Sequence, residues 1–200
     1  MDCYSMLANP NKAPFMGLTS MHKLPSEHDL AEAILAATKL AISKLFNLHA
    51  EHFYYLSLIT TGEAHAPFIS AWSLEALSKA VAKHDASSER LLKWSYSDSP
   101  YMCFGEEYFG EVNRLFSLRP EMSALMSDAK QEAEYELRLR AMEWAMKRLD
   151  EAHLFGSGAK RAKLIINVEV MPPDLTNAER ARRLNPPEAI VQWLAEAAEE

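Results

Sequence analysis

A chain of 200 residues, 48% of them hydrophobic, is long enough for one domain that buries roughly 70% of its unfolded surface without a metal or a disulfide. Its formal net charge of −7 argues against a nucleic-acid partner, because phosphate backbones are bound by clustered Lys and Arg, and it permits a basic protein partner. No apolar run approaches the roughly 18 residues that cross a bilayer, and the first residues lack a secretory signal. We therefore expect a cytoplasmic protein with no membrane contact.

The N-terminal segment differs in composition from the rest. Residues 1–24 contain Asn, Pro and Gly without periodicity, which predicts an extended or disordered arm before a single globular domain at 25–200. Cys3 in this arm and Cys103 are the two cysteines. Such sparse cysteines predict no structural disulfide and a reducing compartment.

The first elements of the domain have clear signals. Ser26 and Asp29 resemble a capping box, and a helical stripe of apolar residues follows, so we predict a helix at about 27–48. His52–Thr60 is apolar on both faces, which is typical of a central strand covered on both sides. A turn with Gly then leads to a second strand at Ala66–Trp72, which makes a hairpin.

The middle of the chain is less regular. Ser73 can cap a helix that runs to about Val81, and a polar loop follows at 85–90. Leu91–Trp94 is a short strand or a turn. The spacing of apolar residues in Gly105–Leu118 predicts a helix.

The longest apolar stripe predicts a helix at about 120–153 that begins at Pro120. Pairs such as Glu134 with Arg138 have the favourable i,i+4 orientation. The Met-rich stretches at 122–126 and 142–146 could join subunits.

The C-terminal part predicts one more strand within Lys160–Pro173, where residues 164–170 carry the β-branched residues. Thr176 and Glu179 resemble a capping box for a short helix, and a last helix begins near Asn185. We therefore predict an α+β fold in which several helices pack on a small, mainly antiparallel sheet of about three or more strands.

Motifs that dictate a reaction are missing from the sequence. His49 and His52 are too few for a metal site, and the chain has no nucleophile elbow and no Gly-rich phosphate loop. The sequence thus predicts no cofactor and no metal, and it identifies no catalytic residue.

The stretch from Lys93 to Phe104 combines aromatic and acidic side chains, and it suggests a candidate pocket or interface. The candidate residues of this pocket or interface are Tyr55, Trp94, Asp98, Tyr101 and Glu106. We expect Trp94 to pack on the strands around Tyr55, while Asp98 and Ser99 shape a turn. On that basis Trp94→Ala should cost roughly 3–5 kcal/mol of stability.

Several segments resemble a known family. They include FYYLSL, SLEAL and LKWSYSDSPY, followed by FGSG, INVEV and RLNPPE. The most telling are Trp94-Ser95-x-x-Asp98 and Leu184-Asn185-Pro186, although the family pattern has Trp where this chain has Ser99. Over about residues 27–195 the chain resembles a bacterial domain-of-unknown-function family numbered four-three-zero-three. The resemblance implies a compact α/β domain and supplies no catalytic residues.

Three functional hypotheses remain open. The preferred one is a non-catalytic protein-binding module, either a toxin-immunity protein or a regulator, with a basic partner permitted by the charge. The second is an enzyme, such as a small-molecule hydrolase, that uses a pocket near residues 94–108. The third is an oligomeric structural protein, for which a homodimer is the simplest form.

Overall fold

The computed structural model describes residues 23–83, 88–125 and 127–198. The predicted arm lies outside these ranges except for Lys23 and Leu24. Cys103 is disulfide-bonded, so the expectation of free cysteines is wrong for this residue. The other cysteine, Cys3, lies outside the described residues.

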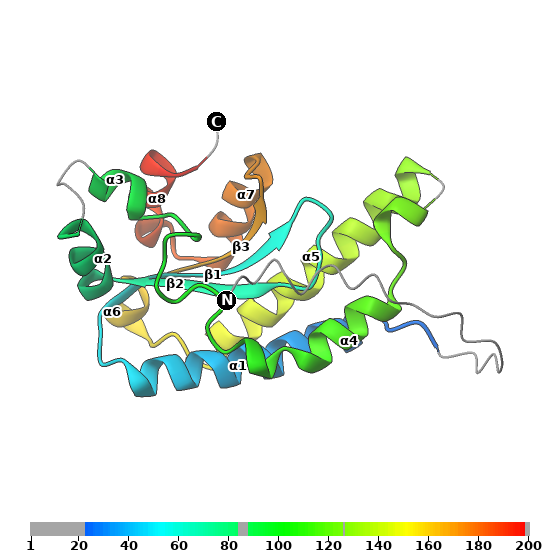
Figure 1. The fold of residues 1–200 in the computed structure, drawn as a ribbon, viewed down its shortest axis with the longest axis horizontal. Helices are drawn as coiled ribbons and strands as arrows, with labels where there is room; N and C mark the ends of the chain where they lie inside the picture. The colour runs from blue at the N-terminus through cyan, green and yellow to red at the C-terminus, as the bar shows by residue number, and fades with distance from the viewer. Residues whose placement is uncertain (1–22, 84–87, 126, 199–200) are drawn as a thin grey trace.

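The described residues form helices around one small sheet (Figure 1). In chain order the elements are α1 (Glu27–Leu48), β1 (Phe53–Thr61), β2 (Phe68–Ser73), α2 (Leu74–Val81), α3 (Glu89–Leu92), η3 (Glu106–Tyr108), α4 (Gly110–Leu118), η4 (Met122–Ala124), α5 (Asp128–Glu151), α6 (Gly158–Arg161), β3 (Ile165–Met171), α7 (Leu175–Leu184), η5 (Pro187–Ala189) and α8 (Val191–Glu196).

The sheet has the order β2-β1-β3. β1 pairs antiparallel with β2 and parallel with β3, so the α+β class and the central position of β1 are confirmed, and the sheet is mixed. The short connection between β1 and β2 makes a hairpin, whereas the long helical connection to β3 allows a parallel pair. The sequence pattern did not predict this parallel pair.

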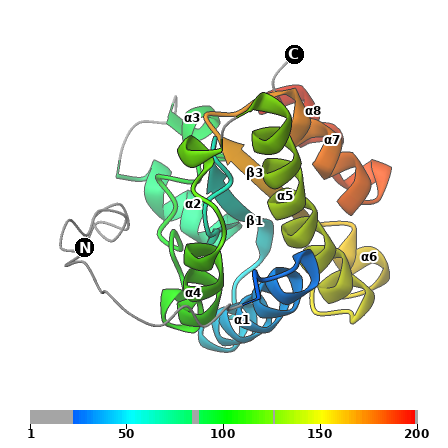
Figure 2. The same ribbon diagram turned by 90° about the vertical axis from the view of Figure 1, so that its right-hand side faces the viewer.

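Helices cover both faces of the sheet. In Figure 1, α1 and α4 lie below the strands and α5 runs obliquely from the upper right to a position below them, while α3, α7 and α8 lie above the strands. Figure 2, which is turned by 90°, shows the lower end of α5 beside α1, with α4 on the other side of α1. α5 packs against both α1 and β3, which places the main apolar core between this helical layer and the sheet.

Helix α1 has the predicted bounds because its N-terminal signal is local. The Ser26 hydroxyl oxygen accepts a hydrogen bond from Asp29 N, and the Asp29 carboxylate accepts one from Ser26 N at 2.8 Å. This capping box satisfies amide groups that have no partner within the helix.

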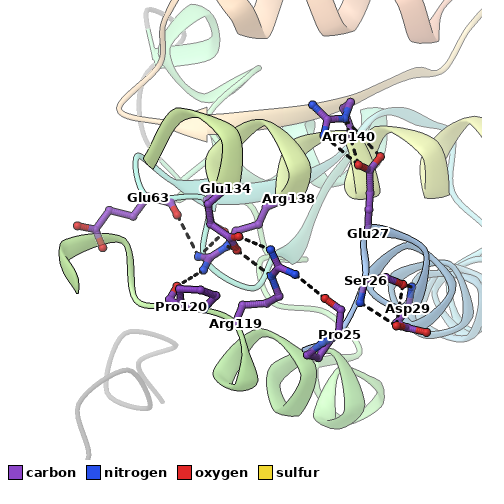
Figure 3. A network of polar contacts seen from close by, with 11 residues as sticks. Pro25, Ser26, Glu27, Asp29, Glu63, Arg119, Pro120, Glu134, Arg138 and Arg140 are labelled. Carbon is purple, nitrogen blue, oxygen red and sulfur yellow. Dashed lines mark hydrogen bonds and ion pairs between the residues drawn. The ribbon is translucent and has the colours of Figure 1, made fainter. Parts of the chain in front are cut away.

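Helix α5 begins at Asp128, not at the predicted Pro120. Residues 119 and 120 instead enter a buried network, shown in Figure 3. Glu134 accepts hydrogen bonds from Arg119 and Arg138, and Arg138 also donates to the Pro120 carbonyl at 2.6 Å. Arg119 donates to the Pro25 carbonyl, so the network joins the end of α4, the start of α1 and α5. In a helix that began at Pro120, the Pro120 carbonyl would instead accept a hydrogen bond from a backbone amide of the same helix.

Helix α5 turns its methionines inward. Met142 and Met146 are fully buried in the core, so in this fold they pack inside the domain rather than on its surface. Of the other Met-rich stretch, Met126 lies outside the described residues.

The outer edge of β3 is covered by three side chains from α7 and its C-terminal end. Asn185 accepts from Ile166 N at 2.9 Å and donates to Ile166 O at 2.6 Å. Asn177 makes the same pair of bonds with Val170, and Arg180 donates to Val168 O. The edge strand therefore offers these groups to no further strand.

One local detail differs from the expectation. The N-cap of α7 is Asp174, whose carboxylate accepts from Thr176 N at 2.9 Å, so the capping box at Thr176 and Glu179 is wrong. At the opposite edge of the sheet, Cys103 N donates to Ile69 O at 2.8 Å and the Ser99 hydroxyl donates to Ala71 O. The segment after Trp94 thus covers β2.

Candidate functional site

The two faces of the sheet have different chemistry, although both are buried. Successive side chains of a strand point to opposite faces, and partners in register share a face. One face carries the apolar side chains Leu56, Leu58, Ile166, Val168 and Val170. The other carries the polar side chains together with two isoleucines, and we call it the polar face. Its residues are Tyr55, Ser57, Ile59, Ser70, Trp72, Ile165, Asn167 and Glu169.

Glu169 is the ionisable carboxyl group of the polar face. It is 5% exposed, and its Oε1 accepts from the Tyr55 hydroxyl at 2.8 Å and from Asn167 Nδ2 at 3.3 Å. Burial raises the pKa of Glu169 above its ordinary value, although the hydrogen bonds from Tyr55 and Asn167 oppose that shift. The protonated form is therefore favoured more than in water.

Asn167 holds a buried polar atom without a hydrogen bond. Its side chain is fully buried, and Nδ2 donates to Glu169 and to the Asn177 carbonyl, whereas Oδ1 has no partner. An unsatisfied buried carbonyl costs roughly 1–3 kcal/mol. Such a group next to a buried acid marks this part of the sheet as a candidate site.

Trp94 lies over the polar face, as the sequence predicts. Its ring lies 5.4 Å from the ring of Tyr54 and 6.0 Å from that of Tyr55, both edge-on. Its Nε1 donates to Glu196 at 2.9 Å, and Lys93 donates to the same oxygen at 3.0 Å. These contacts hold Trp94, which is half-buried, against α8.

Hydrogen bonds from Lys93, Trp94 and Gln192 lower the pKa of Glu196 to about 2, so this carboxylate stays charged at neutral pH. Two further bonds attach the same segment to β2: Trp72 Nε1 donates to Ser95 O at 2.7 Å, and the Ser70 hydroxyl donates to Tyr96 O at 3.0 Å. The segment from Lys93 to Tyr96 is therefore fixed to both α8 and the sheet.

A small pocket opens where Trp94 meets the polar face. Its volume is about 130 Å³. Its lining residues are Trp94, Glu169, Met171, Pro173, Asn177, Trp193 and Ala197. The structure therefore brings two of the predicted site residues together here, because Trp94 lines the pocket and Tyr55 holds the Glu169 carboxyl group.

The other predicted site residues lie elsewhere. Asp98 is exposed, and its Oδ2 accepts from the Ser95 hydroxyl at 2.5 Å within a turn. Glu106 is exposed in η3. Neither of these two carboxylates lines the pocket.

Tyr101 belongs to a separate cluster near the start of β1. It is buried against Phe53 and His49, and its hydroxyl donates to Glu51 Oε2 at 2.6 Å. Ser73 donates to the same carboxylate while its oxygen caps α2 through Ala76 N. The arrangement resembles a catalytic Ser–Glu pair, but the cap accounts for the position of Ser73.

Glu169 and Trp193 are the site residues that the sequence reasoning missed. The signal for Glu169 is the alternation in INVEV, where Asn167 and Glu169 interrupt a β-branched strand at a spacing of two. A strand covered on both faces should be apolar throughout, so two polar residues at that spacing indicate a polar row on one face. Trp193 has no comparable signal, because an amphipathic helix normally buries its Trp.

Residues 23–83, 88–125 and 127–198 contain no group of three or more His, Cys, Asp or Glu that could hold a metal ion. Within the same ranges, every helix is too short or too polar to span a bilayer.

The fold and this site define an α+β domain with a three-stranded mixed sheet and a buried acid beneath a tryptophan cover. Residues 34–186 match the family described as Domain of unknown function (DUF4303), and the chain belongs to that family. Comparisons with curated proteins and with solved structures found no match.

The motif residues that carried the resemblance now have structural roles. Asn185 of Leu184-Asn185-Pro186 pairs with both backbone groups of Ile166. Ser95 and Asp98 close the turn after Trp94. These residues hold the cover and the edge of the sheet in place around the pocket.

Proposed function

We propose that this chain is a non-catalytic protein-binding module, and that its partner contacts the surface around Trp94. The observation that carries the proposal is the fixed, half-buried indole of Trp94, which lines a small pocket. Aromatic anchors of this kind contribute most of the binding energy in many interfaces, and an anchor that is already ordered loses little entropy on binding.

The placement of the acidic residues supports binding over catalysis. A general acid–base pair needs two groups that converge on one reacting atom, whereas Asp98 and Glu106 lie outside the pocket lined by Glu169. The net charge of −7 permits a basic partner. We further propose that the protein is bacterial and cytoplasmic and acts as a regulator or as a toxin-immunity protein.

The test is affinity capture from cells of the native host with three forms of the chain. Wild type and Trp144→Ala should retain one stoichiometric protein partner, and Trp94→Ala should lose it. Trp144 is a matched control because it is also half-buried, but it belongs to α5 and packs against His28, away from Trp94. A wild-type chain that captures no stoichiometric protein, or an equal yield with Trp94→Ala, would contradict the proposal.

An enzyme is the second candidate, and one observation favours it. Glu169 combines burial, a raised pKa and a pocket, a combination that is enriched at catalytic sites. This version places the acid at Glu169 and retains Trp94 from the predicted pocket at 94–108. Turnover in a hydrolase substrate screen that is lost in Glu169→Gln would favour it over binding alone.

A further inference from the structure

The pocket next to Trp94 suits a small group and not a whole ligand. Its volume of about 130 Å³ is well above the 10–15 Å³ that one water needs and below the 300–1,000 Å³ of ordinary ligand pockets. A single side chain or the end of a small molecule fills such a space.

The polar atoms of the lining are nearly all engaged. The side-chain oxygen and nitrogen of Asn177 bind Val170, and the indole nitrogen of Trp94 binds Glu196. The hydrogen bonds from Tyr55 and Asn167 both go to Oε1 of Glu169, and Ser57 is a further neutral partner of this carboxyl group. A carboxylate oxygen accepts more than one bond, so Oε2 can receive a group from the pocket. The pocket thus offers one carboxylate oxygen between two indoles, together with the apolar Met171 and Pro173.

This combination selects for a cation that has an apolar stem. Indole rings attract ammonium groups, and a carboxylate adds a counter-ion. An anion would be repelled by the Glu169 carboxylate, and an apolar group would leave that buried charge without a counter-ion in the pocket.

The charged groups around Glu169 are compatible with this choice. Tyr55 from β1 is a neutral donor, because burial raises its pKa well above the ordinary value. Arg180 from α7 attracts the Glu169 charge, but its guanidinium donates to Val168 O, Thr176 and Asn177. Lys93 lies 5.0 Å from the Trp94 ring and is paired with Glu196. Both nearby cations therefore have other partners.

We propose that the pocket between Trp94 and Trp193 binds an alkylammonium group with Glu169 as its counter-ion. The inference deepens the proposed function and rests on it for the source of the group, which is a lysine side chain of the protein partner. A cation in the pocket stabilises the ionised form of Glu169. If Glu169 is protonated before the cation binds, binding therefore releases that proton to the solvent.

The test follows the indole N–H signals of Trp94 and Trp193 by NMR while n-butylammonium is added at pH 8. We expect saturable shifts at both indoles, with an affinity at least tenfold above those of 1-butanol and butyrate, which keep the stem and change the charge. Glu169→Gln should reduce binding of n-butylammonium at least tenfold. Glu188→Gln, which changes an exposed carboxylate on η5, should leave it unchanged.

Two results would overturn the inference: equal binding of 1-butanol, or unchanged binding of n-butylammonium in a Glu169→Gln variant that melts like the parent. Blocked lysine (N-acetyl-lysine amide) tests the source of the group. Binding at least as tight as that of n-butylammonium supports a partner's lysine, and much weaker binding overturns that source. The protein could capture a partner in a Trp94-dependent way and yet show no binding of n-butylammonium or blocked lysine by NMR. That result would refute this inference and leave the proposed function standing.

Discussion

Two buried glutamates in this protein have opposite electrostatic surroundings. Glu134 lies between Arg119 and Arg138 (Figure 3), and although burial alone would raise its pKa, the two guanidinium groups lower it below the ordinary value. Glu169 accepts from a phenol and an amide, which carry no charge, so burial dominates and its pKa is raised. A buried acid paired with cations holds elements together, whereas a buried acid with neutral donors remains able to take a proton or a cation.

The largest effect is expected from Glu134→Gln. The change removes the counter-charge of two buried arginines, which should cost about 3–5 kcal/mol of unfolding free energy. Urea denaturation at pH 7 measures it, and Glu132→Gln, an exposed position on the same helix, should change stability by less than about 0.5 kcal/mol. Equal stability of the two variants would mean that the network does not hold α4 to α5.

Trp94→Ala tests the cover of the polar face. Because the ring is half-buried, we expect a loss of about 2–3 kcal/mol, below the 3–5 kcal/mol of a fully buried Trp. The same denaturation experiment should give a smaller loss for Trp94→Phe, which keeps a ring against Tyr54 and Tyr55. A Trp94→Ala variant that melts like the parent would show that the indole is a surface group.

Glu169→Gln tests the raised pKa through the pH dependence of stability. The folded state binds the Glu169 proton more tightly than the unfolded state, so this residue's contribution is complete below pH 4.5 and declines as the pH rises above it. The variant should be more stable than the parent at pH 8, by about 1.4 kcal/mol for each unit of pKa difference, and its profile should be flatter. Parallel profiles between pH 4.5 and 8 would contradict this.

Glu134 should show the reverse dependence in the wild-type protein. Its lowered pKa gives stability that is present above pH 4.5 and lost as the pH falls below it. The two residues therefore act in different pH ranges, which allows their contributions to be separated in one titration.

Ser57→Ala should have the smallest effect. Ser57 is fully buried on the polar face, where its neutral hydroxyl bonds Glu169 and makes a long bond of 3.4 Å to Leu58 O, so we expect a loss of about 0.5–1.5 kcal/mol. Leu58→Ala at the next position, on the apolar face, should cost about 2–5 kcal/mol. Similar losses at these neighbouring positions would remove the distinction between the two faces.

Local signals explain which parts of the fold could be predicted. The capping box at Ser26 involves residues only three apart, and it marks the start of α1. The cap at Ser73 likewise marks the start of α2. The start of α5 could not be predicted in this way, because Arg119 and Pro120 are held by groups from α1 and α5 that are distant in sequence.

Some residues of the candidate site could likewise be predicted from the sequence, and others could not. Trp94 and Tyr55 meet as predicted, since an aromatic residue near a buried strand has few other places to pack. Asp98 and Glu106 looked equally suitable in the sequence, but one closes a turn and the other lies in η3. Nearness in sequence does not place side chains in one pocket once the backbone turns between them.

The sequence by itself determined the α+β class, the central strand, the bounds of α1 and α2 and the family, because these depend on periodicity, caps and short motifs. The tertiary structure alone decided that β3 pairs parallel with β1, that Asn177 and Asn185 close its edge, and that Glu169 lies under Trp94. The physical reason is that the pKa and the partners of a buried acid depend on which distant residues surround it, and residues 55, 94, 169 and 193 meet only after folding.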